Sequence, residues 1–263
     1  METLLEYPNM PKAAQKLPLP EELDTEKGEH LEVCQCILCG VVQLNNSPVP
    51  YYKEVIRAVA FSEEMREFRT RQFAELADKH SLKGKPIIEV GCGEGEYLSL
   101  MRDAGMDVYG IEYGRSSVSR CLDKGLKVRE FYIESQFDEI IHKTFDCFFI
   151  MNFFEHLPDP NFTLKCLHHD LSDDGVGIIE VPNFDMMISN DLFSEFISDH
   201  LFYYTKDTLT SVLERNGFEV EKCEVILHDY IISATVRKRK ILNLDSFKVA
   251  QKRIQSQINT YIN

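Results

Sequence analysis

The sequence predicts a doubly wound α/β fold, in which helices cover both faces of a mostly parallel sheet that a closing antiparallel strand pair completes. From residue 85 onward, short apolar runs alternate with segments of helical periodicity, and this order builds a parallel sheet. The first of these runs stops at a glycine-rich turn. The last two runs, residues 218–225 and 230–237, follow each other without a helix between them, which is typical of an antiparallel pair.

Two segments precede this core. Residues 1–50 are expected to form a small N-terminal extension, extended or loosely ordered up to residue 30, with a small hairpin or knuckle over residues 31–45. Residues 51–84 carry apolar side chains at helical spacing, which predicts one or two helices that lead into the core.

The core domain is predicted over residues 85–240, in a Rossmann-like arrangement. Its predicted strands are residues 86–90, 108–112, 126–130, 145–151 and 176–182, before the closing pair. Its predicted helices are residues 97–104, 116–124, 162–171 and 205–216. Glycines at Gly105, Gly125 and Gly217 follow three of these helices, as helix-ending residues do. The tail, residues 241–263, is polar and is expected to be helical.

Composition narrows the classes of function. The 263 residues carry a formal net charge of −14, whereas nucleic-acid binding requires a basic surface, so no nucleic-acid partner is expected. No apolar run reaches the roughly 18–20 residues that span a bilayer, so no membrane partner is expected. The N-terminus lacks the basic and apolar regions of a secretion signal, which indicates a cytoplasmic location. The sequence carries no signal for an oligomeric state.

The glycine-rich turn reads Glu89-Val90-Gly91-Cys92-Gly93-Glu94-Gly95. Glycine permits positive φ and a close approach of a ligand to the backbone, and the next helix offers its N-terminal N–H groups. A dinucleotide site requires Gly-x-Gly-x-x-Gly, but here the third glycine comes one residue early and lies between two glutamates. Carboxylates would repel a pyrophosphate, so the turn suits a cationic ligand better. A purely structural strand–helix turn is the alternative.

Two further features lie at predicted strand ends. Glu112 ends the second strand, 19 residues beyond Gly93, where an acid can accept hydrogen bonds from ribose hydroxyls. The strand over residues 145–151 runs into Asn152 and then into residues 155–160, Glu-His-Leu-Pro-Asp-Pro. The carboxyl edge of such a sheet is where ligands bind.

Together these motifs resemble the class I S-adenosylmethionine-dependent methyltransferases over residues 85–236. The resemblance implies S-adenosylmethionine as the cofactor and assigns the turn to it: Glu89, Gly91, Cys92, Gly93 and Gly95. Glu89, Gly91 and Gly93 would hold the methionine end, and Glu112 the ribose. The residues that would flank the adenine are Tyr113 and either Ile133 or Tyr132. The residues expected near the sulfonium are Met151 and Asn152.

A narrower resemblance, to deoxysugar C-methyltransferases, is carried by residues 36–44, with Cys36-x-x-Cys39-Gly40, and by residues 196–205. It implies a small sugar-like acceptor, a sugar or a nucleotide-linked sugar, methylated at oxygen or carbon. Possible zinc ligands are Cys34, Cys36 and Cys39, with His30 as a fourth. Reduced thiols without a metal are the alternative. This chain lacks the Tyr-x-Tyr-x-Ser-Ser motif and the long C-terminal domain of that family.

Methyl transfer often requires a base beside the acceptor. Our hypothesis is that His200 is this base, oriented by Asp199 or a neighbour, with His156 as the second choice. A structural role for these histidines is the alternative. Two other classes of function remain open, a cofactor-binding regulatory protein without turnover and a methyltransferase that acts on a macromolecule.

Overall fold

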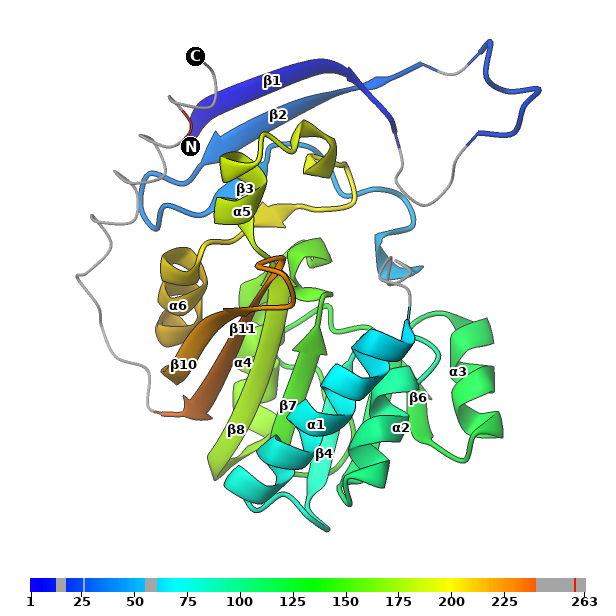
Figure 1. Ribbon diagram of the computed structural model, residues 1–263, viewed down its shortest axis with the longest axis vertical. Helices are drawn as coiled ribbons and strands as arrows, with labels where there is room; N and C mark the ends of the chain where they lie inside the picture. Colours follow the sequence, from blue (N-terminus) through cyan, green and yellow to red (C-terminus); the bar gives the residue numbers. More distant parts are fainter. Residues whose placement is uncertain (13–17, 26, 55–60, 240–257, 259–263) are drawn as a thin grey trace.

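Two β-sheets organise the chain (Figure 1). The computed structural model describes residues 1–12, 18–25, 27–54, 61–239 and 258. The larger sheet has seven strands in the order β10-β11-β8-β7-β4-β5-β6. Their bounds are β4 Pro86–Val90, β5 Asp107–Glu112, β6 Lys127–Glu130, β7 Phe145–Met151, β8 Leu171–Pro182, β10 Phe218–Ile226 and β11 Ile231–Lys238.

The pairing within this sheet confirms the predicted fold class. Strands β4 to β8 are mutually parallel, whereas β11 pairs antiparallel with both β8 and β10. Strand β7 is buried along its whole length except at Asp146, as expected of a strand covered on both faces. The parallel strands therefore present their carboxyl ends along one edge, where the glycine turn and Asn152 lie.

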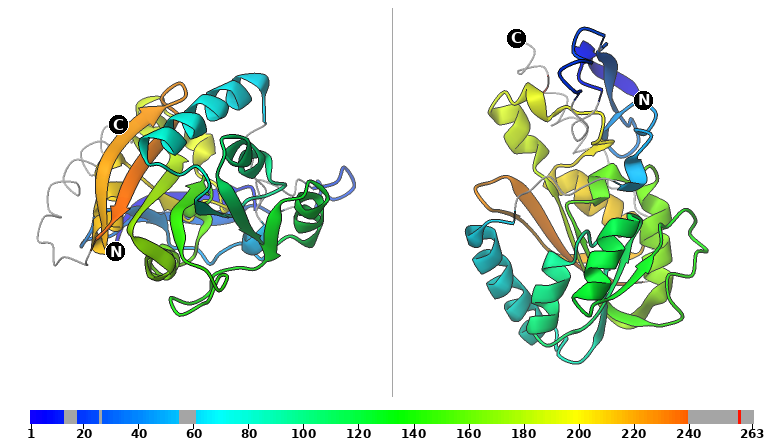
Figure 2. Two further views of the ribbon diagram at one scale, coloured as in Figure 1. Left: turned by 90° about the horizontal axis from the view of Figure 1, so that it is seen from below. Right: turned by 90° about the vertical axis from the view of Figure 1, so that its right-hand side faces the viewer.

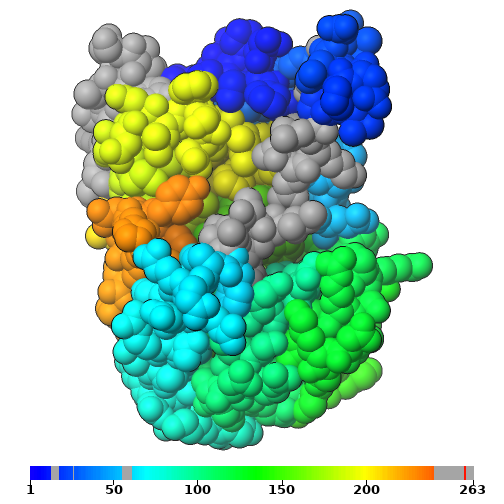
Figure 3. Space-filling view, turned by 45° about the vertical axis from the view of Figure 1, so that its right-hand side comes forward, coloured from blue at the N-terminus to red at the C-terminus, as the bar shows by residue number. Residues whose placement is uncertain are grey.

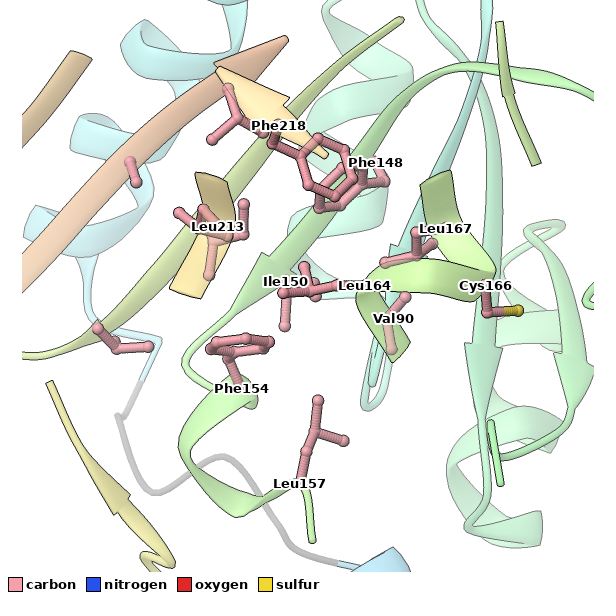
Figure 4. Close-up of a cluster of buried hydrophobic side chains, with 14 of the residues drawn as sticks. Val90, Phe148, Ile150, Phe154, Leu157, Leu164, Cys166, Leu167, Leu213 and Phe218 are labelled. Carbon is pink, nitrogen blue, oxygen red and sulfur yellow. The ribbon is translucent and has the colours of Figure 1, made fainter. Parts of the chain in front are cut away.

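Helices cover both faces of the larger sheet. One apolar core packs under α1 Glu63–Lys79, α2 Glu96–Asp103 and α3 Arg115–Asp123. The other packs under α4 Pro160–Asp170 and α6 Lys206–Arg215. Figure 4 shows this second core, where the rings of Phe148 and Phe218 meet with their centroids 5.5 Å apart. Sequence features start these helices: Ser62 caps α1, and Asp159 caps α4 with Pro160 at its first position.

The smaller sheet has the order β1-β2-β3-β9 and is antiparallel throughout. Its strands are β1 Glu2–Met10, β2 Glu29–Gln35, β3 Val42–Leu44 and β9 Phe202–Tyr203. The predicted hairpin over residues 31–45 is present as β2 and β3. The sequence allows either an extended or a loosely ordered chain up to residue 30. Residues 2–10 are extended, because β1 pairs with β2 along its length.

The smaller sheet joins the N-terminal strands to β9, which follows β8 in the chain, at the carboxyl edge of the larger sheet. Figures 2 and 3 show the N-terminal strands (blue) beside the segment that follows β8 (yellow), at the end of the molecule away from α1 and α2. The backbone links run from Leu44 N to Leu201 O, and from Leu201 N to Glu155 O, at 3.0 and 2.9 Å. The N-terminal extension is therefore linked through Leu201 to the loop that follows β7.

Six elements were not predicted as such. Four are short helices, η1 Tyr52–Glu54, η2 Phe154–His156, α5 Phe184–Ser189 and η3 Phe193–Glu195, and two are the strands β1 and β9. Within residues 51–84 the structure shows one long helix, α1, and residues 55–60 lie outside the described part. The predicted helical tail, residues 241–263, lies outside it too, except for Ile258. No helix among the described residues is long and apolar enough to cross a membrane.

Candidate functional site

The glycine turn folds as a tight bend between β4 and α2. Gly91, Gly93 and Gly95 all have positive φ, at 67°, 55° and 79°. The backbone N–H groups of Gly91 and Cys92 both donate to the carbonyl of Ile111 on the neighbouring strand, at 3.0 and 3.2 Å. Left-handed backbone at every second position is inexpensive only for glycine, which explains the spacing of the three glycines.

A cavity of about 350 Å³ opens at this bend. It brings together five of the predicted cofactor residues, namely Gly91, Gly93, Glu112, Met151 and Asn152. A narrow adjoining slot of about 10 Å³ brings together the three residues predicted to flank the adenine, Tyr113, Tyr132 and Ile133. Gly91, Glu112 and Phe153 line both spaces, so they form one continuous site along the carboxyl edge of the sheet.

Backbone hydrogen bonds fix the carboxylate of Glu112. Its Oε2 accepts the N–H of Gly93, and its Oε1 accepts the N–H of Gly114, each at 2.9 Å. The side chain is only 9% exposed, at the end of a buried strand. Each carboxylate oxygen has a second acceptor position. The geometry therefore presents a preoriented acceptor pair to a ligand with adjacent hydroxyl groups.

Acidic side chains outnumber basic ones in the lining of the larger cavity. Glu54, Glu94, Glu96 and Glu112 border it, and the one basic side chain among the described residues of its lining, Arg120, is paired with Glu94. Since opposite charges attract across such a short range, this lining favours a cationic ligand and disfavours a pyrophosphate.

Phe153 is a site residue that the sequence did not single out. A Cβ built on Gly91 would lie 2.7 Å from the Phe153 ring, so the ring lies directly over the glycine. The neighbouring Asn152 has a φ of 52°, and its N–H donates to the carbonyl of Glu180 at 2.9 Å. A residue that leaves a strand in this conformation turns the next side chain back over the strand end. No local sequence pattern predicts this turn.

Three predicted cofactor residues lie away from the cavity. Glu89 and Cys92 are fully buried. A Cβ built on Gly110 would lie 2.8 Å from the Cys92 sulfur, so this thiol packs between strand and helix. A Cβ on Gly95, the residue before α2, would lie 2.4 Å from Leu126 Cδ1 and 3.0 Å from Cys121 Sγ. The Cys92 side chain and the absence of a side chain at Gly95 allow the turn to pack against β5 and α3, and a contact of these two residues with the ligand stays a prediction.

We expect Gly95→Ala to lower the free energy of unfolding by about 2–3 kcal/mol, because it combines an unfavourable positive φ with overpacking. Gly125→Ala is the matched control, since Gly125 has a φ of 70° and no atom within 4 Å of its Cβ position. The control should lose only about 1 kcal/mol, from the backbone alone. Urea unfolding measures both values, and equal losses would contradict the packing role of Gly95.

The three predicted catalytic residues meet where η2 approaches the segment before β9. The rings of His156 and His200 lie 4.8 Å apart between centroids. The Nδ1 atom of His156 lies 2.6 Å from the backbone carbonyl of Asp199. The carbonyl of Asp199 therefore orients His156, and the orientation of His200 by Asp199 or a neighbour stays a prediction.

Both imidazoles favour their neutral forms. Burial lowers the pKa of His156 to about 4. Burial also holds the pKa of His200 well below its usual range, and the neighbouring His156 lowers it further. The rings of Phe153 and His156, with centroids 6.3 Å apart, connect this pair to the cofactor cavity.

The predicted zinc ligands are not gathered into one site in the part of the chain that the structure describes. Cys34 directs its sulfur toward Thr3 Oγ1 on β1, at 3.8 Å, whereas Cys36 and Cys39 lie on the turn between β2 and β3. Within the described ranges, the side chains that do group as three metal-ligand candidates are Glu155, His156 and His200.

Comparison with known proteins supports this geometry. A family profile of a methyltransferase domain matches residues 61–222. The C-methyltransferase NovU of Streptomyces niveus is 26% identical over 140 residues, which are 52% of this chain and 33% of NovU. A ubiquinone biosynthesis O-methyltransferase of Aliivibrio fischeri is 33% identical over 92 residues, 32% of this chain and 38% of that enzyme. The chain thus spans little more than a third of the length of these relatives.

Two solved structures show the same fold. Magnesium protoporphyrin IX methyltransferase from Synechocystis, with bound SAH, has 14% identity and a TM-score of 0.54, over 70% of this chain and 90% of that one. An S-adenosylmethionine-dependent methyltransferase from Clostridium acetobutylicum has 13% identity and a TM-score of 0.55, over 72% of this chain and 96% of that one.

Proposed function

The chain belongs to the methyltransferase domain family, and on that premise we propose that it transfers a methyl group from S-adenosylmethionine to a small polar metabolite, a sugar or a nucleotide-linked sugar. The observation that carries the proposal is the carboxylate of Glu112, held by two backbone N–H groups at the mouth of an acidic cavity.

The described residues fit this donor at each of its parts. The two adjacent ribose hydroxyls match the paired acceptor positions of Glu112. The acidic side chains of the cavity suit the amine and the sulfonium. The aromatic and apolar side chains that line the slot, Tyr113, Tyr132 and Ile133, suit an adenine ring, for which the slot must widen. When bound, S-adenosylmethionine supplies an electrophilic methyl group. Met151 and Asn152 line the same cavity at the end of β7, toward the histidine pair.

On the acceptor side, we assign the role of base to His200. A hydroxyl acceptor must lose a proton as its oxygen forms the new bond to the methyl carbon, while the electrons of the broken carbon–sulfur bond remain on sulfur. The neutral imidazole of His200 has a nitrogen lone pair for that proton. His156, fixed by the Asp199 carbonyl, packs beside the His200 ring and positions it.

The proposal of a sugar as the acceptor depends on sequence similarity alone. NovU, a C-methyltransferase, is among the relatives, and residues 36–44 and 196–205 resemble the corresponding motifs of deoxysugar C-methyltransferases. The ubiquinone biosynthesis O-methyltransferases point to an acceptor oxygen on a precursor of ubiquinone instead. Transfer from labelled S-adenosylmethionine to nucleotide-linked deoxysugars, phenols and proteins separates these classes. We expect label in the nucleotide-linked sugars. Donor binding without transfer to any acceptor would favour a regulatory protein.

We expect His200→Asn to reduce the rate of transfer about 10²–10⁴-fold, because general base catalysis contributes that much. The dissociation constant of the donor should stay within about threefold of the wild-type value, since His200 does not line the cofactor cavity. His169→Asn is the control, with a side chain that is 85% exposed on α4. A wild-type rate for His200→Asn on the true acceptor would refute the assignment of His200 as the base.

A further inference from the structure

A carboxylate and two imidazoles converge where the loop after β7 meets the segment before β9. Glu155, His156 and His200 each offer one ligand atom, and these atoms lie within 4.8 Å of one another. The separation between His156 Nε2 and Glu155 Oε1 is 3.8 Å. We call these three residues the Glu–His–His group.

His156 is oriented as a metal-binding histidine is. Its Nδ1–H donates to the carbonyl of Asp199 at 2.6 Å, which fixes the tautomer and leaves the lone pair on Nε2. That atom faces Glu155. Metal-bound histidines commonly donate their second N–H to a carbonyl in this way.

The other two members complete a suitable donor set. Glu155 is 2% exposed and brings a negative charge, which compensates a buried cation. His200 is partly exposed, so it provides a route by which an ion can enter from solvent.

We propose that Glu155, His156 and His200 bind a divalent first-row transition metal ion of the zinc and iron(II) class. Two imidazoles and one carboxylate select such ions over Mg²⁺ and Ca²⁺, which prefer oxygen ligands. A zinc ion with bonds of about 2.0–2.2 Å holds tetrahedral ligand atoms about 3.4 Å apart. The 3.8 Å separation is close to this value, and the three ligand atoms, which lie within 4.8 Å of one another, would draw together around an ion. Three protein ligands leave one position open.

Metal binding at this group would exclude the use of His200 as a base. A nitrogen that donates its lone pair to a metal cannot also accept a proton. Zinc should therefore inhibit methyl transfer at the concentration at which it fills the site. The binding itself does not depend on the proposed function and can be measured without any acceptor.

The test is a titration of the full chain with Co²⁺, whose visible absorption reports its ligand geometry, after removal of metals by a chelator. Cys36→Ser/Cys39→Ser serves as the background, because these thiols could bind the same ion. We expect one Co²⁺ per chain, displaced by Zn²⁺ but not by Mg²⁺. In that background His200→Asn and Glu155→Gln should each weaken binding at least about 100-fold, and His169→Asn should not change it.

Binding of S-adenosylmethionine to the same samples shows that each variant is folded and tests the proposed function separately. Donor binding without saturable Co²⁺ binding would overturn the metal site and leave the methyltransferase proposal standing. Co²⁺ binding that His200→Asn leaves unchanged would also overturn it. If Zn²⁺ fills the site and raises the rate of transfer, the metal site stands and the assignment of His200 as the base is wrong.

Discussion

Glu112→Ala should bind S-adenosylmethionine at least about 100-fold more weakly than the wild-type chain. A hydrogen bond to a charged group contributes about 1.5–3 kcal/mol, and the variant loses the acceptor of two such bonds from the ribose. It also releases the N–H groups of Gly93 and Gly114, which Glu112 now accepts at 2.9 Å. The loss of about 3 kcal/mol or more corresponds to that factor. Isothermal titration with S-adenosylmethionine measures it.

Two further variants separate the role of the carboxylate from a general effect of charge. Glu112→Gln keeps one acceptor oxygen and should lose affinity by an intermediate factor. Glu130→Ala is the matched control, because Glu130 lies directly opposite Glu112 on the neighbouring strand and is paired with Arg115 at the surface. It should bind the donor about as the wild type does. Wild-type affinity in Glu112→Ala would show that the ribose binds elsewhere.

Arg69→Met should lower the free energy of unfolding by about 3–5 kcal/mol, the largest stability effect we expect. Arg69 on α1 and Glu180 on β8 form an ion pair at 2.6 Å in which both side chains are fully buried. Gln72 and Ser233 also donate to the same carboxylate, at 2.7 and 3.0 Å. Removal of one partner leaves an uncompensated buried charge, which is far more costly than the loss of a surface pair.

The same variant links stability to the site. The backbone carbonyl of Glu180 accepts a hydrogen bond from the N–H of Asn152. A displacement of Glu180 in the variant should therefore also increase the mobility of the end of β7. Arg66→Met is the control, since Arg66 is exposed on the same helix, and its loss should be below about 0.5 kcal/mol. Urea unfolding compares the two. If Arg69→Met and Arg66→Met unfold at the same urea concentration, the buried pair does not stabilise the fold.

The order of strands and helices in the larger sheet could be predicted because each element carries its own periodicity and its own stop signal. Gly105, Gly125 and Gly217 each follow the helix that they were expected to end, and each has positive φ. That five residues line one cavity could be predicted for a related reason. Gly91, Gly93, Glu112, Met151 and Asn152 lie at or after the ends of parallel strands, and those ends share one edge.

Contacts between distant segments could not be predicted in this way. The two residues of β9 pair with β3, which lies about 160 positions earlier in the chain, and a two-residue strand is too short to show an alternating pattern. The position of Phe153 depends on the left-handed backbone at Asn152. The bond from His156 to the carbonyl of Asp199 joins residues 43 positions apart, so no local sequence pattern could predict it. Cys92 and Gly95 belong to the motif but serve its packing.

The central claim is that Glu112 and the glycine turn hold S-adenosylmethionine. A crystal structure of the full chain with bound S-adenosylhomocysteine, the demethylated cofactor, tests it most directly. We expect both ribose hydroxyls within hydrogen-bond distance of the Glu112 carboxylate, the adenine between Tyr113 and Ile133, and the sulfur beside Asn152. A ligand bound elsewhere, or a ribose that does not contact Glu112, would contradict the claim.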